Sequence, residues 1–433
     1  MLLILGAGES GIGAALLAKK LGMIAFVSDA NLIRDSFKSE LVSNEIDFEE
    51  GGHEMAYEIS PEFVIKSPGI SEQTDIIKHF SNLGVEIISE IEFASRHCNA
   101  CIVGVTGSNG KTTTTNLIYH LLHSAGKDVV KAGNVGHSFA RALSQKNWEY
   151  YVLELSSFQL DGIKQFRPDL AILLNITPDH LDRYQNSFEN YVASKFRITL
   201  NQNHNDHFIV YGNDEAIKKY LQIHPSKARI VNCIPELTPL DVLLENNQTL
   251  VDLSHTCLKG RHNAINAMCA IKAAQLLNIS MDSIQNALNS FVNDPHRLEF
   301  VSSINDIDFI NDSKATNVDS VFWALDAMKK KVVWIAGGQD KGNDYTVLEA
   351  LVKQKVSALI AMGIDNRKLV DAFGKLIPVI RDTHSLDDAV RQAFECAHPG
   401  EVVLLSPACA SFDLFKNYED RGTQFKEAVR KLN

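Results

Sequence analysis

The segment GVTGSNGKTT at residues 104–113 combines the residue types that bind nucleoside triphosphates. Backbone N–H groups of a glycine-rich turn converge on phosphate oxygens, and the N-terminus of a following helix favours negative charge. Lys111 can reach the terminal phosphates, and the Thr112 hydroxyl can ligate Mg2+. Val105 stands where the strict G-x-x-x-x-G-K-[ST] motif has glycine, so the match is incomplete. We expect ATP to bind at Gly107, Ser108, Asn109, Gly110, Lys111, Thr112 and Thr113.

Two polar groups follow apolar runs that could lie beside this turn. Glu154 stands at the end of the run 150–155, where a carboxylate suits an Mg2+ partner of the phosphates. His180 and Asp182 follow the run 170–175 and could ligate a second metal or contact substrate. The alternatives are a surface glutamate at a strand tip and an exposed loop histidine.

A second glycine turn lies at the N-terminus. Gly6, Gly8 and Gly11 form a G-x-G-x-x-G pattern after an apolar run, and Asp29 ends the next run. This arrangement is typical of dinucleotide binding and keeps a hydride-transfer enzyme open as an alternative. That alternative leaves the turn at 104–113 unexplained.

Composition excludes several classes of protein. Apolar residues make up 45% and charged residues 22% of the 433 positions, as in soluble globular proteins. The net charge of −11 disfavours nucleic acid and anionic membranes as partners. The apolar N-terminus is too short for a signal peptide, and no run approaches the ~20 residues that span a bilayer. We expect a cytoplasmic monomer that binds neither membrane nor nucleic acid.

The seven cysteines do not suggest a disulfide framework, because their number is odd and their spacing scattered. Cys98 and Cys101 form a C-x-x-C pair without a second half to complete a zinc site. We expect two ordinary thiols in a reducing compartment.

Short apolar runs alternate with helical stretches along the whole chain, which predicts an α/β fold with parallel sheets. We expect three domains, at 1–89, 90–293 and 294–433. Polar residues or glycines follow the strands of the third domain, so a ligand should bind at that sheet edge. The predicted strands are 2–5, 24–28, 63–66, 85–88, 101–105, 150–155, 170–175, 309–311, 332–336, 358–362 and 402–405, with helices at 10–21 and 263–277. An ATP-driven enzyme that joins a nucleotide-linked substrate to a second substrate accounts for all three domains.

Several segments resemble the Mur ligases, ATP-dependent amide-forming enzymes of bacterial cell-wall synthesis. The similarity covers all three predicted domains. It includes residues 104–113, GNVG at 133–136, ELSSFQL at 154–160, NITPDHLDRY at 175–184, DPHRLE at 294–299 and NDSKATN at 311–317. LSPACASFD at 405–413 with FKNY at 415–418 is similar to the branch that adds D-glutamate to UDP-N-acetylmuramoyl-L-alanine.

The resemblance implies a Rossmann-like N-terminal domain, a central P-loop ATPase-like domain and a Rossmann-like C-terminal domain. It implies that ATP converts a substrate carboxylate to an acyl phosphate, which the amine of D-glutamate attacks. The catalytic residues it implies are Lys111, His180, Lys195 and Lys314. The metal ligands it implies for Mg2+ are Thr112, Glu154, His180 and a carbamate formed on Lys195. Without the family, Lys195 reads as a solvated lysine on a helix.

The resemblance also implies ligand contacts. For ATP these are Asn263, Asn266, Arg297 and Asp312, in addition to the glycine turn. For the UDP-linked substrate they are Gly8, Ser10, Asp29, Gly69, Asn134 and His180. For D-glutamate they are Thr316, Lys341, Ser411, Phe412 and Tyr418. From the residues alone, Asn263, Thr316 or Ser411 could instead cap a helix.

This chain departs from the family pattern at several positions. Ser10 replaces a threonine, and Ala30 and Asn31 replace the threonine and arginine that follow the uracil-reading aspartate. Phe412 and Tyr418 replace a leucine and a phenylalanine. A relative that adds another amino acid, folylpolyglutamate synthetase and a nucleotide-gated binding module are the remaining alternatives. The segment 406–418 argues against the first two.

Overall fold

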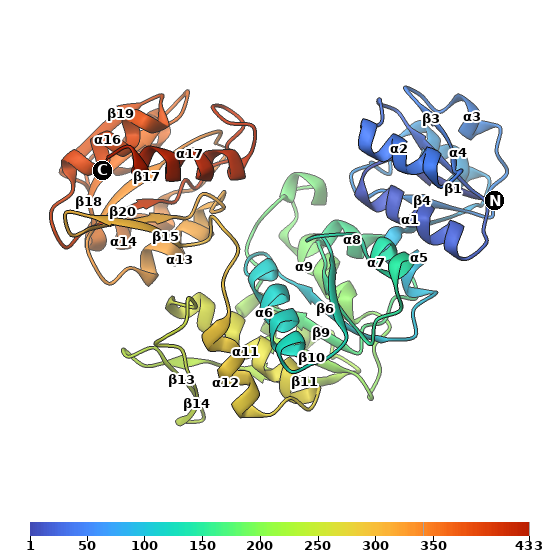
Figure 1. Ribbon diagram of the computed structural model, residues 1–433, viewed down its shortest axis with the longest axis horizontal. Helices are drawn as coiled ribbons and strands as arrows, with labels where there is room; N and C mark the ends of the chain where they lie inside the picture. Colours follow the sequence, from blue (N-terminus) through green and yellow to red (C-terminus); the bar gives the residue numbers. More distant parts are fainter. Residues whose placement is uncertain (341, 433) are drawn as a thin grey trace. The chain divides into compact units, whose positions relative to one another are not determined.

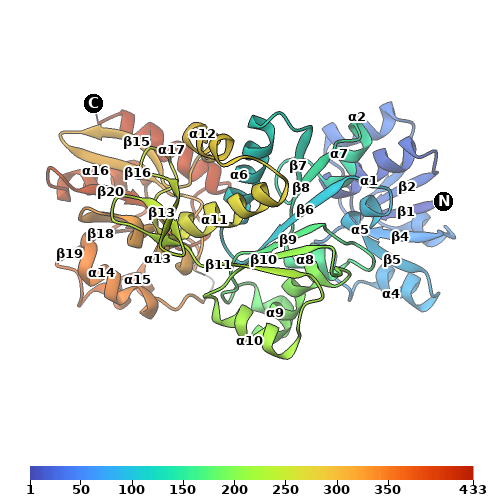
Figure 2. The same ribbon diagram turned by 90° about the horizontal axis from the view of Figure 1, so that it is seen from below.

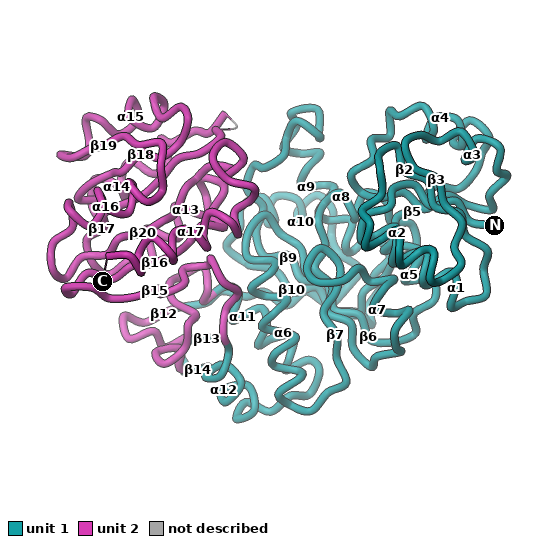
Figure 3. The backbone as a smooth tube through the Cα atoms, turned by 45° about the horizontal axis from the view of Figure 1, so that its top comes forward, with its two compact units in different colours: residues 1–236, 244–251, 265–291 teal, residues 237–243, 252–264, 292–433 magenta. Residues whose placement is uncertain are grey.

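The computed structural model describes residues 1–340 and 342–432. Contacts divide the chain into two compact units, shown in Figure 3. Unit 1 contains residues 1–236, 244–251 and 265–291, and unit 2 contains residues 237–243, 252–264 and the chain from 292 onward. Within the described residues, no helix is long and apolar enough to cross a bilayer.

The first sheet of unit 1 is parallel, with strand order β3-β2-β1-β4-β5. This is the order of a Rossmann-like half, in which the strand order reverses between β1 and β4. The strands are β1 (Leu2–Leu5), β2 (Ala25–Asp29), β3 (Asp47–Glu50), β4 (Phe63–Lys66) and β5 (Glu86–Ser89). The helices are α1 (Glu9–Lys20), α2 (Asp35–Ser43), α3 (Glu54–Tyr57), α4 (Asp75–Asn82) and α5 (Glu90–Ser95).

Alternation along β1 explains how this sheet buries both faces. Leu2 and Ile4 pack with α1 and α5, whereas Leu3 and Leu5 pack with α3 and α4 on the opposite face. All four side chains are at most 1% exposed. A strand that is covered on both faces has a continuous run of apolar residues in the sequence. The bounds of β1 could be predicted for this reason.

The second sheet of unit 1 is also parallel, with order β11-β10-β9-β6-β8-β7. Its strands are β6 (Cys101–Thr106), β7 (Val129–Gly133), β8 (Tyr150–Glu154), β9 (Leu170–Leu173), β10 (His207–Tyr211) and β11 (Arg229–Cys233). Its helices are α6 (Lys111–Ser124), α7 (Phe139–Gln145), α8 (Ser157–Asp161), α9 (Phe188–Phe196) and α10 (Glu215–Ile223), with short 3-10 turns η1 (Leu181–Tyr184) and η2 (Arg197–Thr199). β6 lies between β8 and β9, so the glycine turn that follows it lies at the centre of the sheet edge (Figure 1).

A smaller three-stranded sheet follows, of order β12-β13-β14. Its strands are β12 (Glu236–Leu237), β13 (Val242–Glu245) and β14 (Gln248–Asp252), and helices α11 (Gly260–Leu276) and α12 (Met281–Ser290) come after it. α11 begins at Gly260, earlier than the predicted 263.

The sheet of unit 2 has order β15-β16-β20-β17-β18-β19. Its strands are β15 (Glu299–Ile304), β16 (Ile307–Asn311), β17 (Val332–Ala336), β18 (Val356–Met362), β19 (Val379–Thr383) and β20 (Val402–Leu405). α13 (Val318–Ala327), η3 (Thr346–Leu348), α14 (Glu349–Lys355) and α15 (Arg367–Phe373) belong to the same unit, as do α16 (Leu386–Cys396) and α17 (Tyr418–Arg430). α13, α14 and α15 pack on one face, and α16 and α17 on the other (Figures 1 and 2).

One edge of this sheet differs from the predicted parallel arrangement. β15 pairs antiparallel with β16. Asn305 and Asp306 form the turn between them with φ of 52° and 64°. Two-residue hairpins need positive φ, and asparagine and aspartate tolerate it best after glycine. The α/β class is otherwise confirmed.

The three large sheets fall within residues 2–89, 101–233 and 299–405. Each therefore lies inside one of the three predicted domains. Unit 1 contains both of the first two sheets. The boundaries at 89 and 293 stay a prediction.

Candidate active site

The glycine turn joins β6 to α6, as predicted. Gly107 and Gly110 have φ of 152° and 85°, values that favour glycine. A Cβ on Gly110 would lie 2.3 Å from Oδ1 of Asn266. Val105 lies within β6, paired with Glu154 of β8. The departure from the strict motif therefore falls in the strand, where extended backbone accepts valine.

Asn175 holds the backbone of this turn from the loop after β9. Its Oδ1 accepts a hydrogen bond from the Asn109 N–H at 2.8 Å, and its Nδ2 donates to the Asn109 carbonyl at 3.0 Å. The Asn175 carbonyl also accepts from the Ser108 N–H at 2.9 Å. Three bonds from one residue fix two residues of the turn, so Asn175 organises the phosphate site that the sequence predicts.

Two lysines converge on the carbonyl of Gly107. Lys111 Nζ donates to it at 2.9 Å and to the Ser108 carbonyl at 2.8 Å. Lys195 Nζ, from α9, donates to the same Gly107 oxygen at 2.8 Å. The structure therefore brings Lys195 to the glycine turn, although 84 positions in sequence separate it from Lys111 (195 − 111).

Lys195 is not the solvated lysine that the residues alone suggest. It is 2% exposed, and its Nζ lies 4.6 Å from the centre of the Tyr191 ring. Burial, followed by the charge of Lys111, lowers the pKa of Lys195 well below its usual value, and Asp179 and Asp161 oppose this only in part. The environment favours the neutral amine.

Glu154 ends β8 beside this turn. It is 2% exposed, which rules out the alternative of a surface glutamate. Its Oε1 accepts from Asn134 Nδ2 at 2.9 Å, and its carbonyl accepts from the Asn134 N–H at 2.8 Å. Its Oε2 is buried without a hydrogen-bond partner among the described residues. A buried carboxylate oxygen in that state is costly unless a ligand satisfies it. Thr112 is also buried, at 6% exposed.

His180 lies on the loop before η1 with φ of 51°. Its side chain is 50% exposed, its Nε2 lies 3.7 Å from Asp179 Oδ2, and its ring packs edge-on against Phe158. Within residues 1–340 and 342–432, no three His, Cys, Asp or Glu side chains gather as a self-sufficient metal site. Mg2+ commonly uses one or two carboxylates together with substrate phosphates, which fits this arrangement.

Asn263 and Asn266 lie one turn apart on α11, and both are 4% exposed. Asn266 reaches Gly110 within unit 1, as described above. Asn263 belongs to unit 2, and its Nδ2 donates to the Lys259 carbonyl at 2.9 Å. Since α11 begins at Gly260, the alternative that Asn263 caps this helix is wrong.

The N-terminal glycine turn lies at the carboxyl end of β1. A Cβ on Gly11 would lie 1.8 Å from the Gly6 carbonyl, so the close packing of α1 on this turn requires glycine. Asp29 Oδ2 accepts from the Ala7 N–H at 2.7 Å, and its Oδ1 accepts from the Asn31 N–H at 2.8 Å. Asp29 thus fixes the turn itself. Gly8, Gly69 and Asn134 are exposed and Ser10 is half-buried, so ligands can reach all four.

In unit 2, Asp312 and Lys314 follow β16 as the sequence predicts. Asp312 accepts from Ser406 Oγ at 2.9 Å and from the Leu298 N–H at 3.2 Å. Burial raises the pKa of Asp312 to about 7. Lys314 Nζ donates to the Tyr418 hydroxyl at 3.1 Å, which places two predicted site residues together. The Nε of Arg297 is buried without a hydrogen-bond partner in the described chain.

The predicted D-glutamate residues differ in exposure. Ser411 is 2% exposed, Thr316 is half-buried, and Phe412 is 67% exposed. Lys341 lies outside the described residues. Neither Thr316 nor Ser411 caps a helix, because Asn317 caps α13 and Asn417 caps α17. The capping alternatives are therefore wrong.

Comparisons with known proteins identify the family. The model of the Mur ligase middle domain matches residues 105–274, and the model of the Mur ligase glutamate ligase domain matches residues 296–409. The chain belongs to the Mur ligase family. It is therefore an ATP-dependent ligase.

Curated relatives match over the whole chain. A UDP-N-acetylmuramoylalanine–D-glutamate ligase of Cytophaga hutchinsonii is 49% identical, with 100% of this chain and 99% of the relative covered. Ligases of the same name from Christiangramia forsetii and Bacteroides fragilis are each 47% identical, with the same coverage.

Solved structures show the same fold in other Mur ligases. MurC of Thermotoga maritima has a TM-score of 0.63 at 18% identity, covering 100% of this chain and 99% of its own. MurF of the same organism, solved with ADP, has a TM-score of 0.63 at 14% identity, covering 94% and 96%. The glycine turn at 6–11 is thus part of a Mur ligase, and the hydride-transfer alternative is wrong.

Arg421 is a residue that the sequence did not single out in this Mur ligase. It is 0% exposed and lies on α17. Its Nη2 donates to the Ser313 carbonyl at 2.8 Å, its Nε to Ser313 Oγ at 3.0 Å, and its Nη1 to the Cys409 carbonyl at 3.2 Å. It thereby fixes the loop with Asp312 and Lys314 to the loop before Ser411. A single arginine in a helix carries no sequence signal of this role.

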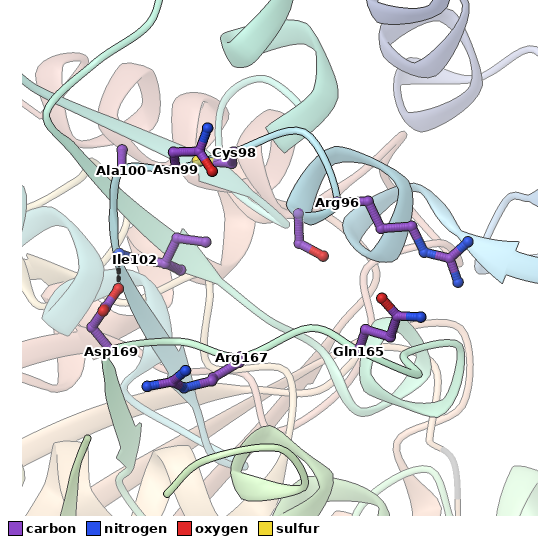
Figure 4. Close-up of a pocket in the computed structure, with 9 residues that line it drawn as sticks. Arg96, Cys98, Asn99, Ala100, Ile102, Gln165, Arg167 and Asp169 are labelled. Atoms are coloured by element: carbon purple, nitrogen blue, oxygen red, sulfur yellow. Dashed lines mark hydrogen bonds between the residues drawn. The ribbon is translucent and has the colours of Figure 1, made fainter. Parts of the chain in front are cut away.

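Cys101 of the C-x-x-C pair begins β6, at the opposite end of that strand from the glycine turn. Cys98 lines an adjoining pocket (Figure 4). Both cysteines are free, and burial raises the pKa of Cys101 to about 12. The adjoining pocket has a volume of about 260 Å3. Its arginines are paired, Arg96 with Glu86 and Glu92 and Arg167 with Asp206. The thiols are thus poor nucleophiles.

Proposed function

We propose that this Mur ligase joins D-glutamate to UDP-N-acetylmuramoyl-L-alanine, cleaving ATP to ADP and phosphate, in peptidoglycan precursor synthesis. The observation that carries the proposal is the 47–49% identity to curated ligases of that name over essentially their whole length. The segment 405–418, which is similar to the D-glutamate-adding branch, is consistent with it. We place the enzyme in the cytoplasm as a monomer, with small-molecule substrates only.

The chemistry begins with a substrate carboxylate, which is a poor electrophile. Transfer of the γ-phosphoryl group of ATP to the alanyl carboxylate gives an acyl phosphate and ADP. The amine of D-glutamate attacks the acyl carbon, forms a tetrahedral intermediate, loses a proton and expels phosphate to leave the amide. Lys111, at the glycine turn, would neutralise charge that develops on the transferred phosphoryl group.

The residues near the turn fit Mg2+. Thr112 and Glu154 would hold one ion, and the unpartnered Glu154 Oε2 is the kind of hard oxygen that Mg2+ prefers. His180 and a carbamate on Lys195 would hold a second. When bound, the ions would supply positive charge to the phosphates.

The surroundings of Lys195 fit carbamate formation. CO2 reacts with a neutral amine, and burial beside Lys111 favours that form. The same Lys111 charge would attract the carbamate anion once formed. A carbamate would also convert Lys195 from a cation into an oxygen donor.

The remaining ligand contacts are those that the resemblance to the Mur ligases implies. Gly107, Ser108, Asn109, Gly110 and Thr113 would contact the phosphates of ATP, Asn263 and Asn266 its adenine, and Arg297 and Asp312 the bound nucleotide. Lys314 would act at the phosphoryl group. Gly8, Ser10, Asp29, Gly69, Asn134 and His180 would contact the UDP-linked substrate. Thr316, Lys341, Ser411, Phe412 and Tyr418 would bind D-glutamate, a dianion that needs several donors.

Release of phosphate from ATP tests the proposal. Purified enzyme receives UDP-N-acetylmuramoyl-L-alanine and, in separate reactions, D-glutamate, L-glutamate, D-aspartate, L-alanine or no amino acid. We expect release that depends on D-glutamate and a product heavier than the UDP-linked substrate by D-glutamate less water. Release that ignores the amino acid, or that is equal with L-glutamate, would refute it.

A further inference from the structure

Helices α1 and α7 of unit 1 pack with their backbones in close approach. A Cβ on Gly13 of α1 would lie 2.0 Å from Ser138 Oγ and 2.9 Å from the Arg141 N–H nitrogen. Lys20 Nζ donates to the Leu143 carbonyl at 2.8 Å on the same interface. Helix α1, which covers the first sheet, therefore packs directly against helix α7, which covers the second sheet.

A charged network lies at the end of this interface next to the N-terminal glycine turn. Glu9, between Gly8 and Ser10 in sequence, accepts on Oε1 from the Ser138 N–H at 3.0 Å and from Arg141 Nε at 2.7 Å. Arg141 Nη1 and Nη2 donate to both carboxylate oxygens of Glu40 on α2. The Arg141 side chain is only 9% exposed, so solvent screens these bonds weakly.

The loop between β7 and α7 connects this network to the phosphate site. Asn134 donates hydrogen bonds to the carbonyl and to the carboxylate of Glu154. Within the same loop, the Gly133 N–H donates to the His137 carbonyl at 2.9 Å. Ser138, at the other end of the loop, donates its backbone N–H to the Glu9 carboxylate. The N-terminal turn and the carboxylate beside the ATP turn are therefore joined through one short loop.

We propose that Arg141 is a positioning residue that sets the distance between the nucleotide end and the reacting end of the UDP-linked substrate's site. The inference rests on the proposed function, because it takes Gly8 and Ser10 as contacts for the UDP portion and Asn134 for the portion nearer the reaction. Arg141 touches no substrate. It acts through Glu9 on one turn and through the start of α7 on the loop that carries Asn134.

The physical reason is that one substrate must engage two sites at once. The UDP portion binds at the first sheet while the alanyl carboxylate has to reach the γ-phosphate at the second. A displacement of about 1 Å between such sites is enough to cost large factors in productive binding. Arg141 supplies a planar fork that meets two carboxylates, and lysine cannot reproduce that geometry.

The test compares Arg141→Met, Arg141→Lys and Glu40→Gln with wild type in steady-state kinetics and in calorimetric binding of UDP-N-acetylmuramoyl-L-alanine. We expect Arg141→Met to raise KM and Kd for this substrate about tenfold, with KM for ATP changed less than about twofold. Arg141→Lys should recover part of the loss, and Glu40→Gln should show a smaller rise of the same kind.

Arg391→Met is the matched control, because Arg391 also pairs with two carboxylates but lies exposed on α16. Its kinetic constants should equal those of wild type. A folded Arg141→Met enzyme with unchanged KM and Kd for the UDP-linked substrate would overturn the inference, as would equal rises for both substrates. If Arg141→Met does not fold, a Glu40→Gln enzyme with unchanged KM and Kd for the UDP-linked substrate would overturn the inference instead. Failure of wild type itself to use D-glutamate would refute the proposed function and is recognisable before any variant is made.

Discussion

Lys111 and Lys195 donate hydrogen bonds to the same carbonyl oxygen, that of Gly107, at 2.9 and 2.8 Å. Two ammonium groups on one acceptor repel each other, and burial of Lys195 strengthens the repulsion. The pair can relax if Lys195 is neutral or becomes an anion. The same geometry leaves Lys111 at the glycine turn, where the proposed mechanism requires its charge.

Replacing Lys111 by alanine should remove most turnover while the fold remains. In the proposed mechanism Lys111 neutralises charge on the transferred phosphoryl group, so its loss should lower kcat by about 10²–10³-fold. Phosphate release measures the rate, and circular dichroism checks the fold. Lys218→Ala, which removes an exposed lysine paired with Glu215 on α10, is the control and should be as active as wild type. Near-normal turnover of Lys111→Ala would rule out the phosphate role.

Replacing Lys195 by alanine should abolish activity in a way that small acids partly restore. The vacated space lies beside Lys111 and the Gly107 carbonyl, so a short-chain carboxylate could take the place of the carbamate anion. Activity should be measured with and without acetate, propionate and butyrate.

Lys195→Arg is the matched variant for this test. It keeps a cation that CO2 does not carbamylate, and it should be inactive without rescue. Full activity of unrescued Lys195→Ala would remove the carbamate from the scheme.

Most of the predicted strands are buried on both faces, although β10 (His207–Tyr211) is buried in the same way and was not predicted. β1, β4, β17 and β20 have the predicted bounds because their apolar runs end at glycine, proline or polar residues. β3 (Asp47–Glu50) gave no such signal. Its acidic side chains are used locally: Glu49 accepts from Ser28 Oγ and from the N–H groups that begin α3, and Glu50 accepts from Lys38 and the Ile33 N–H.

The candidate site could be predicted in part. Lys111 begins α6 after the glycine turn, Glu154 ends β8 and Asp312 follows β16, all as the motifs predict. Asn175, Arg141 and Arg421 act by bridging segments that only the fold brings together, so single positions in the sequence cannot reveal them. Burial is equally invisible to sequence, as the change from a solvated to a buried Lys195 shows.

Arg421→Lys should impair the proposed ATP contacts and the proposed D-glutamate contacts of unit 2 together. A lysine at this position cannot donate to Ser313 and Cys409 at once with the geometry of a guanidinium fork. We expect KM to rise for both ATP and D-glutamate while KM for the UDP-linked substrate stays within about twofold. Arg430→Lys, at the exposed end of α17, is the control. A rise confined to one substrate would contradict the bridging role.

Glu90→Gln should stabilise the protein at alkaline pH. Glu90 is 2% exposed, one of its oxygens accepts from the Ala140 N–H, and the other has no partner in the described chain. Burial raises the pKa of Glu90 from 4.5 to about 8. The folded state therefore binds a proton that the unfolded state has released, and stability falls as pH rises from 4.5 to about 8.

Glutamine resembles the protonated acid and removes this pH dependence. The melting temperature of Glu90→Gln should equal that of wild type near pH 5 and exceed it above pH 8. Glu86→Gln provides a control of opposite sign, because the hydrogen bond from Arg96 lowers the pKa of Glu86 to about 2. That variant should be less stable than wild type at neutral pH, and the difference should vanish as pH falls toward about 2. A Glu90→Gln enzyme that melts below wild type at pH 8.5 would contradict this prediction. It would show that the charged carboxylate stabilises the contact between α5 and α7.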